Sequence, residues 1–209
     1  MRIGIFGGSF DPVHYGHLML AEQCREQARL DKVMFVPAAI SPFKTNGPIA
    51  KDKQRLEMLS LAIAGHSHFE ICALEIKRGG TSFTVDTVSQ LHAENSDAEL
   101  FLLLGEDSLQ SFDRWKDPET ICNLATPLVV RRPGQQPVND GDTVDLSVLK
   151  NLMDEDRFDR ANELAVHSRM IEISGTDIRQ RIAEQKSVRY LLPRSVEKYI
   201  ETQKLYLQN

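Results

Sequence analysis

Two histidines and a group of glycines near the start of the chain are the residues best suited to chemistry. The stretch Gly4–Leu20, GIFGGSFDPVHYGHLML, runs from apolar residues through Gly7 and Gly8 to His14 and His17. Glycine lets a ligand approach the backbone closely, and the free N–H groups of a helix start attract phosphate. Imidazoles three residues apart at such a start can both donate hydrogen bonds into the space before the helix. We therefore interpret this segment as a phosphate site.

The histidine pair also has two other interpretations. Metal binding would need a third ligand, and no further His or Cys lies nearby at ligand spacing. An isolated H-x-x-H is more often a capping or core feature, but Gly7, Gly8 and Gly16 around the pair favour the phosphate role. The glycine spacing matches neither a P-loop nor G-x-G-x-x-G, which argues against a dinucleotide-dependent oxidoreductase.

A second segment, Ile173–Ile182 (ISGTDIRQRI), has the form of a strand end that runs into a helix start. Ser174 is a natural N-cap, in an S-x-x-D pattern that ends at Asp177. Thr176 offers a hydroxyl there, and Arg179 carries a fork of donors suited to phosphate. The alternative is a plain capped helix with a surface arginine.

An α/β fold is expected to position these segments. Short apolar runs alternate with amphipathic stretches, which is typical of an open, doubly wound, mostly parallel sheet. In such a sheet ligands bind beyond the carboxyl ends of the strands. The predicted strands are Arg2–Phe6, Lys32–Pro37, Phe69–Glu75, Glu99–Leu104, Pro127–Val130 and Met170–Ile173. The predicted helices are His17–Leu30, Asp52–Ala64, Val85–Ala93 and Pro118–Leu124.

We expect a single domain over residues 1–209, with a polar insertion at about 135–166 and a C-terminal helical segment at about 175–206. The acidic insertion is interpreted as a solvated face with one or two helices at the edge of the sheet. The tail contains a helix with Pro193 in its first turn. The loop Ile40–Lys53 is long and rich in Pro, Gly and Lys, and such loops are usually functional or mobile.

Composition limits the partners and the compartment. With 25 basic and 30 acidic residues the net charge is −5, so local basic groups must hold any anion, and no nucleic-acid partner is expected. The cysteines, Cys24, Cys72 and Cys122, lack C-x-x-C spacing, which favours buried thiols in a reducing compartment. Neither a signal-peptide pattern nor a membrane span is found. We expect a cytoplasmic protein with small-molecule substrates and no membrane partner, and assembly into a homo-oligomer stays open.

Both motifs resemble signatures of the nucleotidyltransferase superfamily. GGSFDPVHYGH is similar to its (T/H)-x-G-H signature, and ISGTDIR is similar to its ISxTxIR signature. The resemblance implies a Rossmann-like nucleotidyltransferase fold that binds ATP with its triphosphate between two helix starts. It implies catalytic roles for His14, His17 and Arg179. The residues assigned to ATP are Gly7, Gly8, Ser9, Phe10, His14, Gly16, His17, Gly105, Asp107, Ser174, Thr176 and Arg179.

The middle of the chain resembles bacterial nicotinate-nucleotide adenylyltransferases. The segments concerned are KRGGTSFTVDT (Lys77–Thr87), LGEDSL (Leu104–Leu109), SFDRWKDPETI (Ser111–Ile121) and VVRRPG (Val129–Gly134). The family implies transfer of the adenylyl group of ATP to nicotinate mononucleotide, which gives deamido-NAD and pyrophosphate. The residues assigned to nicotinate mononucleotide are Gly8, Ser9, Lys44, Thr84, Asp107, Trp115 and Arg132, with Arg131 as an alternative to the last.

These assignments have physical reasons and plainer alternatives. Asp107 follows a strand end, where a carboxylate can accept hydrogen bonds from both ribose hydroxyls; it and Glu106 also suit a helix start. Trp115, the only tryptophan, offers a flat face to a pyridine ring, although a tryptophan in a helix seam is equally common. Thr84 and nearby N–H groups suit the nicotinate carboxylate. Lys44 suits phosphate, with a plain surface lysine as the default.

The chemistry needs no general base, because the second pKa of a phosphate monoester is about 6 and the attacking oxygen is already ionised. Positioning and electrostatic stabilisation are expected to suffice. We expect Mg²⁺ to arrive with ATP, and no metal site built by the protein. The rival functions are an adenylyltransferase for phosphopantetheine or nicotinamide mononucleotide, and a non-catalytic nucleotide-binding module.

The chain departs from the family pattern at three places. The loop that usually reads P-P-H-K is Ser41–Lys44 here, with Phe43 in place of the histidine. Gly175 replaces a common second serine, and Phe83 stands where tyrosine is frequent. The first departure removes a histidine contact from that loop.

Overall fold

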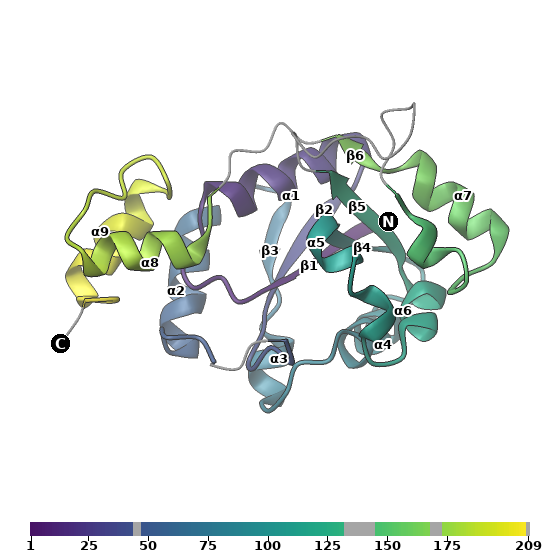
Figure 1. Ribbon diagram of the computed structural model, residues 1–209, viewed down its shortest axis with the longest axis horizontal. Helices are drawn as coiled ribbons and strands as arrows, with labels where there is room; N and C mark the ends of the chain where they lie inside the picture. Colours follow the sequence, from purple (N-terminus) through teal and green to yellow (C-terminus); the bar gives the residue numbers. More distant parts are fainter. Residues whose placement is uncertain (44–46, 132–144, 168–172, 208–209) are drawn as a thin grey trace. The chain divides into compact units, whose positions relative to one another are not determined.

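The computed structural model describes residues 1–43, 47–131, 145–167 and 173–207. Its strands are β1 (Arg2–Gly8), β2 (Lys32–Pro37), β3 (Phe69–Ile71), β4 (Glu99–Gly105), β5 (Thr126–Arg131) and β6 (Val166–His167). Its helices are α1 (Tyr15–Gln27), α2 (Asp52–Ile63), α3 (Leu74–Arg78), α4 (Thr84–Glu94), α5 (Glu106–Leu109), α6 (Pro118–Leu124), α7 (Glu155–Glu163), α8 (Gly175–Ala183) and α9 (Arg194–Gln203), as labelled in Figure 1. Two short 3₁₀ turns, η1 (Phe112–Arg114) and η2 (Ser147–Leu149), complete the described elements.

The strands form one sheet in the order β3-β2-β1-β4-β5-β6. β1 pairs with β4, β4 with β5, and β5 with β6, each in parallel. The strand order reverses between β1 and β4, which is the doubly wound arrangement. This confirms the predicted fold class. β1 ends in Gly7–Gly8 and β4 ends in Gly105, so these strands flank the point where the order reverses. Doubly wound sheets bind ligands beyond the strand ends at this point.

The central strands are buried along their length. Leu100 to Leu104 are all buried, because in a parallel sheet both faces of a strand are covered. In β1, a Cβ atom at Gly4 would lie 2.8 Å from Leu30 Cδ1 and 3.0 Å from Leu103 Cδ1. A side chain at this position would require these leucine side chains to shift.

The described residues fall into two compact units, which we treat separately. The first unit comprises Met1–Gly7, Leu20–Met34 and Phe83–Met170. The second unit comprises Gly8–Met19, Phe35–Ser82 and Ile171–Asn209. In the first unit α4 packs against α6, and α7 packs against β5; in the second, α2 packs against α9 and β3. No helix within the described ranges is long and apolar enough to cross a membrane.

Most predicted elements are confirmed, and two strands are corrected. β2 and α6 have the predicted bounds. The strand predicted at Phe69–Glu75 ends at Ile71, and α3 follows; its sequence LEIKR is rich in helix formers, so the apolar run had two interpretations. Of the strand predicted at Met170–Ile173, only Ile173 lies in the described residues and it is in no strand, whereas β6 lies earlier.

The insertion and the tail are described in part. The insertion contains η2 and α7, with Asp154 as the N-cap that accepts a hydrogen bond from the Arg157 N–H at 2.8 Å. The tail contains α8 and α9, and Pro193 directly precedes α9. Helices were predicted in both places. The single-domain organisation itself stays a prediction.

Candidate active site

His14 and His17 stack at the start of α1, in the second unit. Their ring centroids are 3.7 Å apart and the ring planes differ by 24°. The His14 backbone N–H donates to Nδ1 of His17 at 3.3 Å. Because Nδ1 is the acceptor, a neutral His17 carries its proton on Nε2. The residues at the helix start thus fix the tautomer of His17, with the proton on Nε2.

His14 is almost completely buried, with 6% of its surface exposed. Burial lowers its pKa from 6.5 to about 4, so the imidazole is neutral near pH 7. Within the part of the chain that the structure describes, its Nδ1 atom has no hydrogen-bond partner. Buried polar atoms generally find a partner, and this atom is therefore suited to a ligand or a water molecule. A Cβ atom at Gly16 would lie 3.0 Å from Nδ1, so glycine there leaves room for the ring.

Phe10 supports the histidine pair from the preceding loop. Its backbone has a left-handed φ of 47°, which is uncommon for a bulky residue. Its ring meets the His17 ring edge-on at 5.0 Å and lies 5.6 Å from the Phe35 ring. A Cβ atom at Gly8 would lie 3.0 Å from the Phe10 ring. The Phe10 side chain is buried, so it acts by packing beneath His17.

The second motif forms the start of α8 as predicted. Ser174 is the N-cap, and its Oγ accepts a hydrogen bond from the Asp177 N–H at 3.0 Å. The Arg179 guanidinium donates through Nη2 to Thr176 Oγ1 at 3.1 Å. Through Nη1 it donates to the main-chain oxygen of Asp11 at 2.6 Å. The two motifs, 168 residues apart in the chain at this contact, therefore meet within the second unit.

At Gly175 the backbones of the two motifs lie close together. A Cβ atom at Gly175 would lie 3.1 Å from the main-chain oxygen of Asp11 and 3.4 Å from Arg179 Nη1. Such a distance to a backbone atom is tighter than ordinary van der Waals contact, so a side chain there requires the loop to move. The departure from the family serine thus lies where the two motifs leave little room for a side chain.

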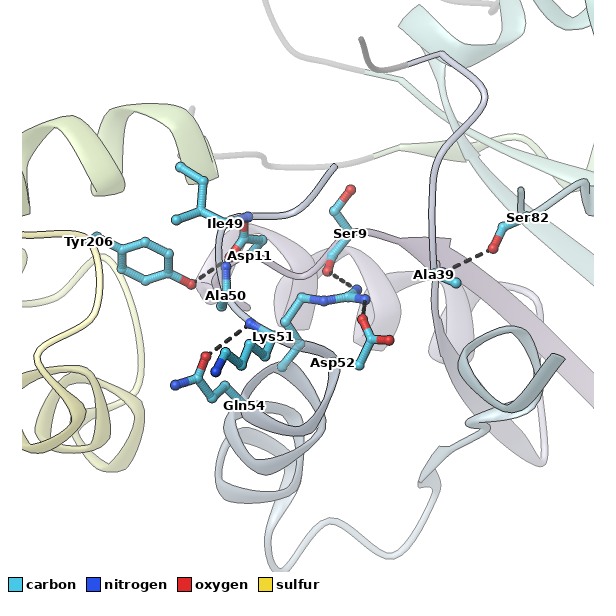
Figure 2. A network of polar contacts seen from close by, with 11 residues as sticks. Ser9, Asp11, Ala39, Ile49, Ala50, Lys51, Asp52, Gln54, Ser82 and Tyr206 are labelled. Atoms are coloured by element: carbon cyan, nitrogen blue, oxygen red, sulfur yellow. Dashed lines mark hydrogen bonds and ion pairs between the residues drawn. The ribbon is translucent and has the colours of Figure 1, made fainter. Parts of the chain in front are cut away.

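Asp11 is the centre of a buried polar network, shown in Figure 2. Its Oδ2 accepts a hydrogen bond from the Ile49 N–H at 2.7 Å. Its Oδ1 accepts from the Ala50 N–H at 3.1 Å and from the Tyr206 hydroxyl at 2.7 Å. These contacts join the loop before α1 to the end of the Pro/Gly/Lys-rich loop and to the tail.

A buried arginine holds the same loop from α2. Arg55, fully buried, donates through Nη1 to the main-chain oxygen of Ser9 at 2.8 Å. Its Nη2 atom lies 2.5 Å from Asp52 Oδ1. No role was predicted from the sequence for Arg55, Asp11 or Tyr206. Tyr206 lies 195 residues from Asp11 in the chain, so no local sequence pattern links them.

Three residues predicted to bind the acceptor, Thr84, Asp107 and Trp115, lie in the first unit, whereas Gly8 and Ser9 lie in the second. Gly105 ends β4, and the exposed Asp107 lies in the four-residue helix α5 that follows it. Thr84 is the first residue of α4 and is half-buried. Trp115 is half-buried, with its ring 5.0 Å from that of the buried Phe112. It thus combines a core contact with an accessible part, so both of its interpretations remain.

Lys116 ties the start of α4 to this segment. Its Nζ atom lies 3.1 Å from Asp86 Oδ1 and 4.6 Å from the centre of the Phe83 ring. Phe83, at the position where the family frequently has tyrosine, thus makes a cation–π contact with Lys116.

The chain is similar to known proteins over almost its whole length. Residues 5–181 match the family model described as Cytidylyltransferase-like. A probable nicotinate-nucleotide adenylyltransferase of Rhodopirellula baltica is 41% identical over 98% of this chain and 92% of its own. That of Thermomicrobium roseum is 42% identical, over 98% and 91% of the two chains. The chain belongs to the nicotinate-nucleotide adenylyltransferase family. This confirms the resemblance inferred from the motifs and makes the protein a nucleotidyltransferase.

Solved structures related to this family share the fold. Plasmodium falciparum nicotinic acid mononucleotide adenylyltransferase complexed with NaAD superposes with a TM-score of 0.73 at 16% identity, over 98% of this chain and 97% of that one. The putative nicotinate-nucleotide adenylyltransferase of Vibrio parahaemolyticus gives 0.68 at 17% identity, over 100% and 96%. These neighbours support the Rossmann-like nucleotidyltransferase fold.

Several predicted family contacts lie outside the described residues. Lys44 and Arg132 belong to this group, and so does the side chain of Arg131. Their roles in phosphate binding stay predictions. In the ranges that the structure describes, no three His, Cys, Asp or Glu side chains form a group able to hold a metal ion.

Proposed function

We propose that the protein transfers the adenylyl group of ATP to nicotinate mononucleotide, giving deamido-NAD and pyrophosphate. The observation that carries the proposal is the hydrogen bond from Arg179 to the Asp11 main chain, which joins both family motifs in one unit. It brings a permanent cation to the loop that leads into the histidine pair. Relatives named for this activity share 36–42% of the sequence.

In the proposed reaction an ionised phosphate oxygen of nicotinate mononucleotide attacks the α-phosphorus of ATP. A new P–O bond forms there as the bond to the β-phosphate oxygen breaks, and pyrophosphate leaves with the electron pair. His17 donates from Nε2–H to the phosphate oxygens, and neutral His14 adds a second donor. Arg179 supplies positive charge, and Ser174 and Thr176 line the start of α8. These fixed donors stabilise charge that develops in the transition state.

Mg²⁺ is proposed to enter with ATP. Asp11, the acid closest in sequence to the histidines, already accepts three hydrogen bonds and is not available as a ligand. This arrangement fits a cation bound by phosphate oxygens and water, with His14, His17 and Arg179 binding the phosphates. When bound, the cation neutralises part of the polyphosphate charge.

For the acceptor we propose the residues at the start of α4 and around α5 and η1. Trp115 stacks on the pyridine ring, and Thr84 with nearby N–H groups binds the nicotinate carboxylate. Asp107 accepts hydrogen bonds from ribose hydroxyls. We assign Gly8 and Ser9 to both substrates, which would contact their backbone.

A parallel assay tests the proposal. Purified protein, ATP and Mg²⁺ are incubated with nicotinate mononucleotide, nicotinamide mononucleotide or phosphopantetheine, and pyrophosphate is measured. We expect the fastest release with nicotinate mononucleotide, loss of activity on chelation, and recovery with added Mg²⁺. Faster release with phosphopantetheine would assign a different acceptor, and no release with any acceptor would indicate a binding module.

A further inference from the structure

Tyr206 is a buried residue in the tail of the second unit. Its backbone has a left-handed φ of 63°, and its side chain is buried, with 8% of the residue exposed. A bulky residue keeps this sparsely populated conformation only where the surrounding structure holds it. In Figure 2 its phenol points toward Asp11, and the hydroxyl donates to Oδ1 at 2.7 Å.

The phenol completes the hydrogen bonding of a buried carboxylate. The other two donors are the backbone N–H groups of Ile49 and Ala50, so Tyr206 is the side-chain donor of the three. Burial and the neighbouring Asp11 charge both raise the pKa of Tyr206, which keeps the hydroxyl protonated as a donor. A hydrogen bond to a charged acceptor is stronger than one between neutral groups.

Asp11 also holds Arg179. Nη1 of the guanidinium lies 2.6 Å from the main-chain oxygen of Asp11 and 4.0 Å from its Oδ2. Nη2 is held by Thr176, so both ends of the fork are fixed. Asp11 therefore accepts a hydrogen bond from the tail through its carboxylate and one from Arg179 through its main-chain oxygen.

We propose that Tyr206 and Asp11 are positioning residues for Arg179. The phenol orients the Asp11 carboxylate, the carboxylate fixes the loop, and the loop oxygen aims the guanidinium toward the ATP phosphates. The inference rests on the proposed function and extends it to a tail residue that neither signature motif contains. Neither side chain needs to touch a substrate.

The chain provides a matched control in Tyr199. Its hydroxyl donates to a carboxylate oxygen of Glu57 and so joins α9 to α2 within the same unit. Tyr199→Phe and Tyr206→Phe each delete one hydrogen bond from a phenol to a carboxylate, but only Tyr206→Phe affects Asp11. Both variants are expected to unfold at a slightly lower temperature than the wild type.

Steady-state kinetics separate the two variants. Tyr206→Phe is expected to lower kcat by roughly tenfold and raise KM for ATP by about threefold, with KM for nicotinate mononucleotide within about twofold. Tyr199→Phe should change all three constants by less than about twofold. Asp11→Asn, which keeps the shape of the side chain, should lower kcat at least as much as Tyr206→Phe. An unchanged kcat in Tyr206→Phe, or an equal loss in Tyr199→Phe, would show that the tail only anchors the fold.

A double-mutant cycle tests whether the effect passes through Arg179. In an Arg179→Ala background, Tyr206→Phe should change kcat by less than about twofold, because the group it positions is gone. A full tenfold loss in that background would overturn the proposal. The cycle is repeated on the affinity for ATP by calorimetry, without an acceptor. Should the wild type release no pyrophosphate, the proposed function fails, whereas coupling between Tyr206 and Arg179 in ATP binding still decides this inference.

Discussion

At the scale of single residues, the histidine pair shows how a backbone sets side-chain chemistry. The N–H of His14, directly before α1, fixes the tautomer of His17, and the missing side chain of Gly16 gives His14 its space. The two rings then differ in role. His17 is a directed donor, whereas His14 is a buried and neutral imidazole.

The directed donor predicts a large kinetic effect for His17→Ala. We expect kcat to fall by roughly 10²-fold or more, the usual loss for one preorganised donor to a transition state. ATP affinity, measured separately by calorimetry, should fall much less. A variant with the kcat of the wild type would remove His17 from the chemical step.

The buried imidazole predicts a pH-dependent stability. The pKa of His14 is about 4 when folded and about 6.5 when unfolded, so between these values the unfolded chain binds the extra proton. The free energy of unfolding should therefore decrease as the pH falls through this window, by up to about 3 kcal/mol in total. Urea titrations from pH 7 to pH 4 measure it. In His14→Gln the free energy of unfolding should decrease less between pH 7 and pH 4, because the contribution of His14 is gone. In His68→Gln, a substitution at an exposed histidine, the full decrease should remain.

Trp115 predicts a change in affinity without a change in preference. Stacking on a base is worth about 1–3 kcal/mol, so Trp115→Ala should raise KM for nicotinate mononucleotide by roughly one to two orders of magnitude. The ratio of rates with the nicotinate and nicotinamide nucleotides should hardly move, because both rings present a π-face. Loss of that preference would make Trp115 a selectivity residue, and no change in either quantity would leave it as a core partner of Phe112.

At the scale of elements, the start of α8 is limited by the loop that precedes α1. Gly175→Ala places a methyl group 3.1 Å from the Asp11 main-chain oxygen, so we expect a melting temperature lower by several degrees and a reduced kcat. Among the described residues, no atom lies within 4 Å of a Cβ added at Gly47, and Gly47→Ala should leave the melting temperature within about one degree. Differential scanning calorimetry compares them, and equal stability of both variants would show that the loop yields without cost.

The elements that sequence periodicity could predict are those long enough to repeat a pattern. β2, α2 and α6 were predicted almost to the residue, and the Ser174 cap followed from its S-x-x-D spacing. α5 has only four residues, too few to show a period, and the apolar residues before α3 suited either state.

The residues of the candidate site likewise include some that the sequence could predict and some that it could not. Residues within the two motifs were found because their types and spacing suit phosphate. Arg55 and Tyr206 were not found, because their partners lie 46 and 195 residues away and only the folded chain brings them together.

At the scale of the whole molecule, each compact unit is assembled from three separate chain segments. Since neither unit is continuous in sequence, we propose that they unfold together, as the predicted single domain would. Far-ultraviolet circular dichroism and tryptophan fluorescence from Trp115 should give coincident thermal transitions. Two separated transitions would instead show two independent folding units.

The hydrogen bond between Asp11 and Tyr206 also has a consequence for protein synthesis. A ribosome makes the loop that contains Asp11 before Tyr206, about 195 peptide bonds earlier. On the inference drawn above, a nascent chain that has not released this tyrosine holds Arg179 loosely. Translation arrested shortly before residue 206 would then yield a chain with both signature motifs and little capacity to use ATP. Full catalytic activity would therefore arise only after Tyr206 has left the ribosome.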